Sequence, residues 1–181
     1  MRQRLRPAYT PEQLAEIYAE PHEHTRWRDH QVRVAVTAAI ADGIDVDSVA
    51  DLSCGDATIA RSVRAWTTIL GDYAPGYEHH GPIEQTIDAI PLVDLFVCSE
   101  TLEHLDDPDL VLRKIRAKAK TLLLSTPVDA WDETNPEHYW AWSREDVESM
   151  LRTAGWKPGV YNALDMRGVW SPYCFGIWMC T

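Results

Sequence analysis

The sequence predicts an α/β fold in which helices flank a mainly parallel β-sheet, with an antiparallel hairpin at the C-terminal end. Short apolar runs alternate with capped helical patterns from residue 44 onward. The run 93–99 is apolar nearly throughout, as is typical of a central parallel strand. The last two strand patterns, 156–164 and 173–180, are joined only by a short turn, which predicts antiparallel pairing.

Length and composition limit the classes of function. The 181 residues suit a single domain, and 45% hydrophobic with 25% charged residues is ordinary for a globular chain. Lys+Arg 17 against Asp+Glu 28 gives 17 − 28 = −11, which argues against nucleic acid and membrane surfaces as partners, because both are bound through basic patches. No apolar run reaches the roughly 18 residues of a membrane span, and no signal peptide is evident. We expect a cytoplasmic protein.

The cysteines and the N-terminal arginines carry no clear functional signal. The four cysteines are Cys54, Cys98, Cys174 and Cys180, and their spacing fits neither a zinc site nor a C-x-x-C pair. We therefore expect free thiols in a reducing compartment, and no metal site. Arg2, Arg4 and Arg6 form the one basic concentration near a terminus, and we expect them to fray in solvent.

Two helices are predicted before the first strand, within residues 1–43. The segment 10–13 (Thr-Pro-Glu-Gln) supplies an N-cap, a proline for the first turn and a glutamine that can close a capping box. A histidine-rich connection follows at 21–24, where the proline ends the first helix, and the second helix is expected over residues 25–42. Because both helices precede the sheet, they can pack on it or cover its ligand-binding edge.

The segment 48–60 reads as a short buried strand, a tight turn and the start of a helix. Asp51 stands near the carboxyl end of the strand, and Ser53, Cys54 and Gly55 form the turn. Small side chains in such a turn let a ligand approach the backbone, and N–H groups at the next helix start can face its polar edge. This pattern indicates a cradle for a phosphate or nucleoside, although a plain connection is the alternative.

The next strand, 67–72, ends in another acidic residue. The preceding helix is expected to continue to residue 66. Asp72 lies 72 − 51 = 21 positions beyond the first aspartate, where a carboxylate can accept hydrogen bonds from both hydroxyls of a ribose. A solvated turn aspartate is the alternative. Residues 80–84 are expected to form a short third strand, with Glu84 near a base edge.

The C-terminal half continues the alternation. Residues 106–109 start a helix with aspartates and a proline in its first turn, and 121–125 is the fifth strand. The long connection 126–142 is rich in proline, aspartate and tryptophan, and long loops at the carboxyl edge of a parallel sheet commonly contact substrate. Ser143 opens a capping box for the last helix.

These segments together resemble the class I S-adenosylmethionine-dependent methyltransferases of the small-molecule type. The similarity runs in order through 49–57, Asp72, 93–108, 122–127 and 138–156. It implies a Rossmann-like seven-stranded mixed sheet with helices on both faces and the C-terminal antiparallel hairpin. Residues 44–181 would form the S-adenosylmethionine-binding core and 1–43 a helical cap within a single domain. The usual Gly-x-Gly-x-Gly turn is reduced here to Gly55, with Ser53 before it and Ala57 after it.

The resemblance also implies which residues contact the cofactor, S-adenosylmethionine. The implied contacts are Asp51, Ser53, Cys54 and Gly55 with its methionine part, Asp72 with the ribose, Ile83 and Glu84 with the adenine, and Ser99, Glu100 and Thr101 with the amino-acid group and sulfonium.

Two histidines are candidate catalytic bases, because an imidazole pKa near ~6.5 suits proton removal at neutral pH. His104 lies within one helical turn of the fourth strand, and His138 lies on the aromatic loop. Either can instead be a structural residue. The expected substrate contacts are Tyr18, Trp27 and His30 in the cap, and Tyr139 and Trp140 in the loop. Packing against the sheet is the alternative for Tyr18 and Trp27, and a helix-surface position is the alternative for His30.

The sequence thus predicts methyl transfer from S-adenosylmethionine to an oxygen or nitrogen atom of a small organic acceptor. A non-catalytic S-adenosylmethionine-binding or scaffold protein is the alternative, supported by the missing glycines and the lack of a certain base. An NAD-dependent Rossmann enzyme is disfavoured, because the Gly-x-Gly-x-x-Gly turn is lacking and the C-terminal hairpin is unexplained by it. The identity of the acceptor and a homodimer are left open.

Overall fold

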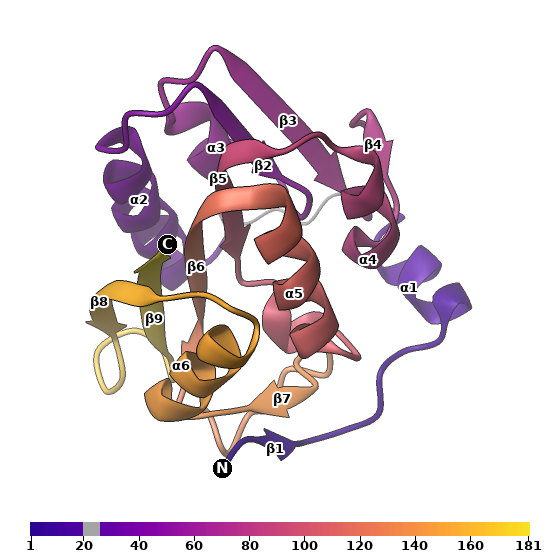
Figure 1. Cartoon of the computed structure of the whole chain (residues 1–181). Helices are drawn as coiled ribbons and strands as arrows, with labels where there is room; N and C mark the ends of the chain where they lie inside the picture. The colour runs from indigo at the N-terminus through magenta and orange to yellow at the C-terminus, as the bar shows by residue number, and fades with distance from the viewer. Residues whose placement is uncertain (20–25) are drawn as a thin grey trace.

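The computed structural model describes residues 1–19 and 26–181, and its central element is a seven-stranded mixed sheet. The strand order is β4-β3-β2-β5-β6-β9-β8 (Figure 1). The strands are β2 (Ser48–Asp51), β3 (Thr67–Asp72), β4 (His79–His80), β5 (Val93–Ser99), β6 (Ala119–Val128), β8 (Pro158–Asp165) and β9 (Cys174–Cys180). The first five are parallel, and β9 runs antiparallel to both β6 and β8. The predicted mixed sheet and its C-terminal hairpin are confirmed.

Helices cover both faces of this sheet (Figure 1). The helices on one face are α2 (Arg28–Asp42) and α3 (Thr58–Ser62), and those on the other are α4 (Ile83–Thr86), α5 (Pro108–Lys118) and α6 (Arg144–Thr153). Side chains alternate along β5 between the two cores. Phe96 and Cys98 enter the larger core under α5 and α6, whereas Leu95 and Val97 enter the smaller one under α2 and α3.

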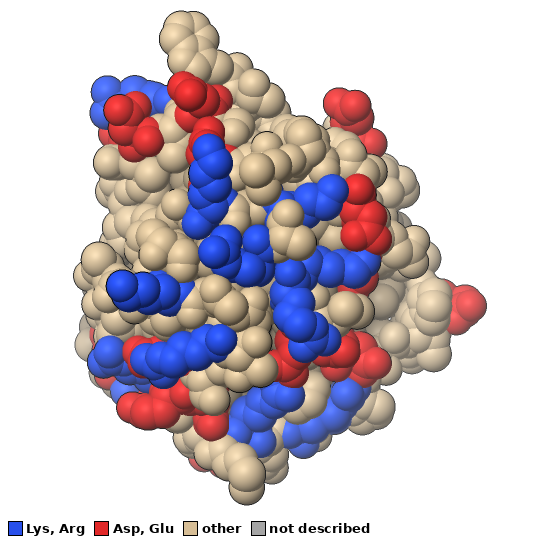
Figure 2. All heavy atoms as spheres, viewed as in Figure 1, with Lys and Arg blue, Asp and Glu red and all other residues tan. Residues whose placement is uncertain are grey.

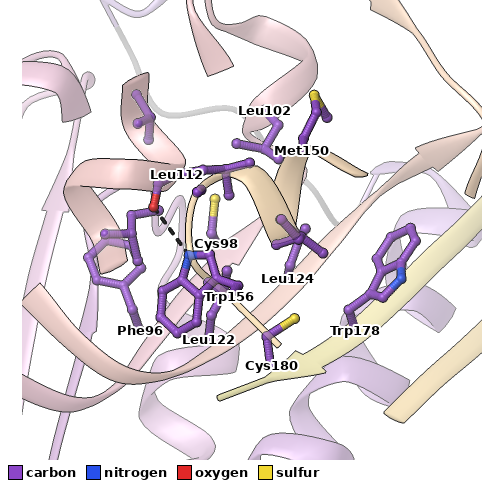
Figure 3. Close-up of a cluster of buried hydrophobic side chains, with 14 of the residues drawn as sticks. Phe96, Cys98, Leu102, Leu112, Leu122, Leu124, Met150, Trp156, Trp178 and Cys180 are labelled. Atoms are coloured by element: carbon purple, nitrogen blue, oxygen red, sulfur yellow. Dashed lines mark hydrogen bonds between the residues drawn. The ribbon is translucent and has the colours of Figure 1, made fainter. Parts of the chain in front are cut away.

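Tryptophan contributes heavily to the larger core, which Figure 3 shows in part. Trp142, Trp156 and Trp178 are each at most 2% exposed. The indole Nε1 of Trp156 donates to the carbonyl oxygen of Leu112 at 3.2 Å, which ties the segment after α6 to α5. A buried indole N–H needs such an acceptor, because an unmet donor in the core costs free energy.

The helix starts that were predicted from capping residues are confirmed for α1, α5 and α6. Thr10 caps α1 (Pro11–Ile17) with a complete capping box, and Ser143 does the same for α6. The side chain of Asp107 accepts from the N–H of Leu110 at 2.9 Å at the start of α5. These starts depend on contacts within a few residues, so the local sequence was sufficient to predict them.

The extents of three elements differ from the prediction. α3 ends at Ser62 rather than at residue 66, because Val63 turns to extended backbone and its side chain packs into the smaller core. The expected strand 80–84 is wrong, since β4 stops at His80 and a helix begins at Ile83, which is buried in the larger core. β6 is longer than 121–125 because its end pairs with β9.

The second helix begins at Arg28, with Trp27 as its N-cap residue. The expected start at residue 25 and the connection 21–24 lie outside the described residues. Among the helices that are described, none combines the length and apolar character that a membrane crossing requires.

The prediction that the N-terminal arginines fray in solvent is wrong. The short strand β1 (Gln3–Arg4) pairs antiparallel with β7 (Trp140–Ala141). The guanidinium of Arg6 donates to the carbonyl oxygens of Glu133, at 2.6 Å, and of Asn135. Carbonyl oxygens in the loop before β7 need hydrogen-bond donors, and the guanidinium of Arg6 supplies them. The segment 1–43 therefore contributes a strand as well as helices.

Basic side chains gather with acidic ones on the face that carries α5 and α6 (Figure 2). Lys114 pairs with Asp88 and Lys120 with Asp94, each with an N–O distance of 2.7 Å. On α6, Arg144 pairs with Glu148 at 2.8 Å. Several positive charges of this face are thus matched by neighbouring carboxylates, in line with a solvated helix surface.

Candidate functional site

A cavity of about 660 Å³ opens where β2, β3 and β5 end. Its volume lies within the range of small-molecule sites, and the carboxyl edge of a parallel sheet is the usual position for such a site. The floor comes from the loops that follow these strands, and the remaining walls come from α1, α2, the start of α4, residues 135–138 and residues 170–175. The chain thus builds the cavity from its N-terminal, central and C-terminal parts.

The loop between β2 and α3 contains two residues in the left-handed backbone region, which favours glycine. Gly55 has a φ of 53° and Ala57 a φ of 61°, both in the left-handed region. This region costs a residue with a Cβ roughly 1–2 kcal/mol, so Gly55 adopts it without that strain, whereas Ala57 is strained. The Oδ1 atom of Asp51 accepts the N–H of Ser53 at 3.1 Å. The one glycine of the turn therefore stands where its conformational freedom is needed.

Asp72 ties the end of β3 to this loop. Its Oδ2 accepts the N–H of Gly55 at 2.7 Å, and its Oδ1 accepts the N–H of Ala74 at 2.9 Å. The side chain is half-buried and lines the cavity. Each carboxylate oxygen keeps further acceptor capacity, so Asp72 can still receive hydroxyl groups from a ligand.

Asp51 is more deeply buried, at 3% exposed. Burial raises the pKa of Asp51 to about 7; the Ser53 N–H opposes this rise and the charge of Asp72 adds to it. A cationic or hydrogen-bond-donating group bound in the cavity would favour the ionised form of this carboxyl.

The end of β5 carries a network of hydroxyl and charged groups. The Oγ of Ser99 accepts from Arg33 Nη1 at 2.7 Å and lies 2.8 Å from the Oγ of Ser125. Ser125 Oγ also donates to Glu100 Oε1 at 2.9 Å. Burial raises the pKa of Glu100, against the opposing charge of Arg33, whose Nε lies 4.0 Å from Glu100 Oε2. Thr101 joins the network to the first loop through its 2.6 Å contact with the Oγ of Ser53.

Arg33 is a cavity residue that sequence reasoning missed. It is 3% exposed, and its Nε has no hydrogen-bond partner among the described residues. Arg33, Thr37 and Ala41 are the buried residues of α2, spaced four apart on one face of the helix. The signal that could have identified Arg33 was its position on the same helical face as Thr37 and Ala41, two small residues that pack inward.

Both candidate bases lie at the cavity and next to each other. The rings of His104 and His138 meet edge to face with centroids 4.8 Å apart. The Nδ1 of His138 lies 2.8 Å from Glu133 Oε2. Although burial lowers it, the pKa of His138 is raised by this hydrogen bond and by the nearby charge of Glu103. Glu133 and Glu103 were not predicted, since their proximity to His138 depends on how the loop folds back.

The predicted substrate contacts divide into two groups. Tyr18, Trp27 and His30 line the cavity, and the ring of Tyr18 lies 5.4 Å from that of Tyr73. Trp27 is 48% exposed. Aromatic side chains of the cap therefore form part of the cavity wall.

Tyr139 and Trp140, in contrast, do not contribute to the cavity as the described residues form it. Tyr139 is 2% exposed, and its hydroxyl oxygen accepts the N–H of Tyr9 at 3.1 Å. Trp140 donates to the carbonyl oxygen of Leu105 at 2.8 Å, and the guanidinium groups of Arg2 and Arg4 each lie 5.1 Å from its ring centroid. Both residues hold the N-terminal strand in place, so their predicted contact with substrate is not supported.

The predicted cofactor contacts all line the same cavity. They are Asp51, Ser53, Cys54, Gly55, Asp72, Ile83, Glu84, Ser99, Glu100 and Thr101. Ile83 also belongs to the larger core, so it can offer only one side to the cavity. Which of these residues bind a cofactor stays a prediction.

Comparison with known proteins identifies the fold. The chain matches no protein-family model, and no curated protein is similar to it at a significant level. Among solved structures it is similar to the 1,6-didemethyltoxoflavin-N1-methyltransferase of Burkholderia thailandensis, with 14% identity over 97% of this chain and 91% of that one, and a TM-score of 0.69. The latter structure contains bound 1,6-didemethyltoxoflavin and S-adenosylhomocysteine.

Two further structures show how varied the proteins with this architecture are. The [4+2]-cyclase SpnF is 13% identical over 96% of this chain and 97% of that one, with a TM-score of 0.67. The small RNA methyltransferase HEN1 is 16% identical over 89% of this chain but only 26% of its own length, also with a TM-score of 0.67. Other neighbours that match over most of their length include a magnesium protoporphyrin IX methyltransferase and the N-methyltransferase NodS. This chain has the fold of the class I S-adenosylmethionine-dependent methyltransferases.

Proposed function

We propose that the chain binds S-adenosylmethionine in this cavity and transfers its methyl group to an oxygen or nitrogen atom of a small organic acceptor. The observation that carries the proposal is the position of Asp72 at the end of β3, where its carboxylate lines the cavity and also holds the glycine turn. A ribose diol fits such an acceptor, because each carboxylate oxygen keeps a lone pair beyond its backbone contact.

The opposite part of the cavity suits an amino-acid group. Arg33 offers an Nε without a partner among the described residues, and Glu100 offers a carboxylate about one ion-pair distance away. A group that carries both an ammonium and a carboxylate can pair with this arrangement of opposite charges. The residues present therefore fit the nucleoside and the amino-acid ends of S-adenosylmethionine.

Aromatic side chains support a small acceptor. Tyr18, Trp27, Tyr73, Tyr173 and Phe175 line the cavity, and flat apolar surfaces of this kind bind ring-containing molecules well. The net charge of −11 disfavours a polyanionic acceptor. The acceptor class is therefore a small organic molecule with a hydroxyl or amine group.

The contribution of the protein would be mainly alignment. When bound, S-adenosylmethionine supplies a methyl group on a sulfonium, activated for displacement. The cavity residues hold acceptor and donor in register and exclude bulk water, and such positioning contributes up to ~7–11 kcal/mol in favourable cases. His138, oriented by Glu133, can take a proton from the acceptor, which typically adds ~10²- to 10⁴-fold in rate.

The proposal is tested in two stages. Calorimetric titration with S-adenosylmethionine, S-adenosylhomocysteine and NAD should give saturable binding of the first two, and binding of NAD alone would overturn the assignment. Incubation of the protein with isotope-labelled methyl donor and pooled small metabolites should then give a labelled product in the mass spectrum. Binding without any methylated product across diverse pools would favour a role other than methyl transfer, either non-catalytic binding or a different reaction such as that of the similar [4+2]-cyclase.

A further inference from the structure

Three side chains with metal-binding atoms meet beside the cavity. A carboxylate oxygen of Glu103 and one ring nitrogen each of His104 and His138 all lie within 4.8 Å of one another. Glu103 and His104 are consecutive residues of the short 3₁₀ helix Leu102–His104 that follows β5. His138 lies 138 − 104 = 34 residues later, in the loop that precedes β7.

The backbone holds these two segments in register. The N–H of Tyr139 donates to the carbonyl oxygen of Glu103 at 2.7 Å, directly beside His138. The N–H of His104 donates to the carbonyl oxygen of Thr101 at 3.0 Å, which fixes the 3₁₀ turn. The three side chains are therefore presented from two segments that main-chain bonds join, as a preorganised ligand set requires.

Glu103 has one oxygen left for a ligand. The residue is 1% exposed, and its Oε2 accepts from Thr126 Oγ1 at 3.0 Å. Its Oε1 is buried and has no hydrogen-bond partner among the described residues. A buried carboxylate oxygen without a hydrogen-bond donor is costly, and coordination to a cation is one way to compensate it.

His138 is oriented as a metal-bound histidine commonly is. Its Nδ1 donates to the carboxylate of Glu133 at 2.8 Å, which leaves the lone pair of Nε2 free to coordinate. Glu133 is itself fixed, because its Oε1 accepts from the hydroxyl of Tyr173 at 3.0 Å and from the N–H of Asn135 at 2.8 Å. A carboxylate behind a ligating imidazole fixes its tautomer and increases its basicity.

We propose that Glu103, His104 and His138 bind a divalent transition-metal cation through one carboxylate oxygen and two imidazole nitrogens. Two imidazoles with one carboxylate favour Mn²⁺, Fe²⁺, Co²⁺ or Zn²⁺ over Mg²⁺ and Ca²⁺, which prefer sets of oxygen ligands. Three protein ligands leave coordination positions for water or for an oxygen or nitrogen atom of a bound molecule. The cluster borders the cavity through both histidines, so such a molecule can reach the cation.

Cation binding goes beyond the proposed methyl transfer and does not depend on it, but a cation on Nε2 of His138 would replace the base role of this residue, because one nitrogen lone pair cannot bind a cation and accept a proton at once. If the bound cation also holds the methyl acceptor, that further role rests on the proposed function. A cation bound here would run counter to the expectation of no metal site, which rested on cysteine spacing and short zinc patterns and so could not detect ligands 34 residues apart.

The test is calorimetric titration of chelator-treated protein with MnCl₂, CoCl₂ and ZnCl₂, with MgCl₂ and CaCl₂ in parallel. We expect one cation per chain for at least one of the first three, and affinities at least tenfold weaker for the last two. Co²⁺ should also give visible absorption bands that report nitrogen ligands. The absence of saturable one-to-one binding by any of the three transition metals would overturn the proposal.

Variants assign the site. Glu103→Gln, His104→Gln and His138→Gln should each weaken cation binding by about a hundredfold or more, and Glu133→Gln by roughly 10- to 100-fold, since loss of a carboxylate behind a ligating histidine has effects of that size. The matched control is His80→Gln, an exposed histidine on β4 outside the cluster, which should bind the cation normally. Thermal melts without metal identify any variant that fails to fold.

The assignment would be refuted if the three cluster variants bound the cation as tightly as the parent protein. It would also be refuted if His80→Gln lost as much cation affinity as the cluster variants. S-adenosylhomocysteine is titrated into the same samples to separate the two proposals. Nucleoside binding without cation binding overturns the metal site alone. Cation binding without nucleoside binding overturns the proposed function alone.

Discussion

Replacing Asp72 by alanine is the most direct test of how the cavity binds its ligand. The carboxylate accepts the N–H groups of Gly55 and Ala74, and it lines the cavity where a ribose diol would lie. The substitution removes two acceptors for ligand hydroxyls and, at the same time, two acceptors that shape the loop. Binding and loop order should therefore both be affected.

The magnitude follows from the number of bonds. A hydrogen bond to a charged group contributes about 1.5–3 kcal/mol, and re-solvation of the half-buried site offsets part of two such bonds. A net loss of about 2–4 kcal/mol corresponds to roughly 30- to 700-fold weaker binding, because each 1.4 kcal/mol is a factor of about ten. Asp72→Asn keeps one oxygen acceptor and should fall between the alanine variant and the parent protein.

The assay is calorimetric titration with S-adenosylhomocysteine, combined with thermal unfolding to confirm that each variant folds. Asp165→Ala is the matched control. Asp165 Oδ1 also accepts the N–H of the residue two positions later, and the substitution removes the same charge. Asp165, however, lies at the end of β8 and does not line the cavity. An affinity within threefold of the parent protein in folded Asp72→Ala would refute the ribose assignment. An equal loss in both variants would attribute the effect to net charge.

Three further predictions address the sheet and the base. Gly71→Ala should destabilise the protein by about 1–3 kcal/mol in urea unfolding, because the new Cβ would lie 2.5 Å from the carbonyl oxygen of His79 on the paired strand. Asp94→Asn should make the protein lose less stability on acidification. Hydrogen bonds from Lys120, and to a smaller extent from Ser48, lower the pKa of Asp94 from 3.8 to about 2. The stabilisation by the ionised carboxylate is therefore present above about pH 4 and is lost as the pH falls toward 2. His138→Ala should lower methyl-transfer turnover by about 10²-fold or more while changing S-adenosylhomocysteine affinity much less.

Each of these predictions has a control and a contrary result. Gly43→Ala, where the nearest atom is 3.4 Å from the new Cβ, should leave stability almost unchanged, and equal stability of Gly71→Ala and the parent would contradict the steric argument. Parallel acid unfolding curves for Asp94→Asn and the parent would remove Asp94 from the acid response. Normal turnover in His138→Ala would exclude this residue as base, and an equal loss of affinity would instead assign it to ligand binding.

Much of the fold could be predicted from the sequence because its signals act over short distances. Thr10, Asp107 and Ser143 cap helices through bonds to residues three positions away, and the apolar run of β5 requires burial on both faces. Asp72 could be placed as a cavity residue because chain order puts the ends of successive parallel strands at one edge. Local spacing gave the wrong element where tertiary packing determined the structure. Residues 80–84 were predicted as a strand, but Ile83 begins a helix and is buried in the larger core.

The sequence by itself determined the alternation of strands and helices, the helix caps and the acidic ends of β2 and β3, since each depends on residues that are close in the chain. Only the tertiary structure decided that Arg33 reaches Ser99, and that Glu103 and His104 meet His138. It also decided that Arg6 anchors the N-terminal segment on the loop before β7 instead of fraying. These contacts join residues between 34 and 129 positions apart, and no short-range pattern specifies them, because they form only when the sheet brings its strand ends and the surrounding loops together.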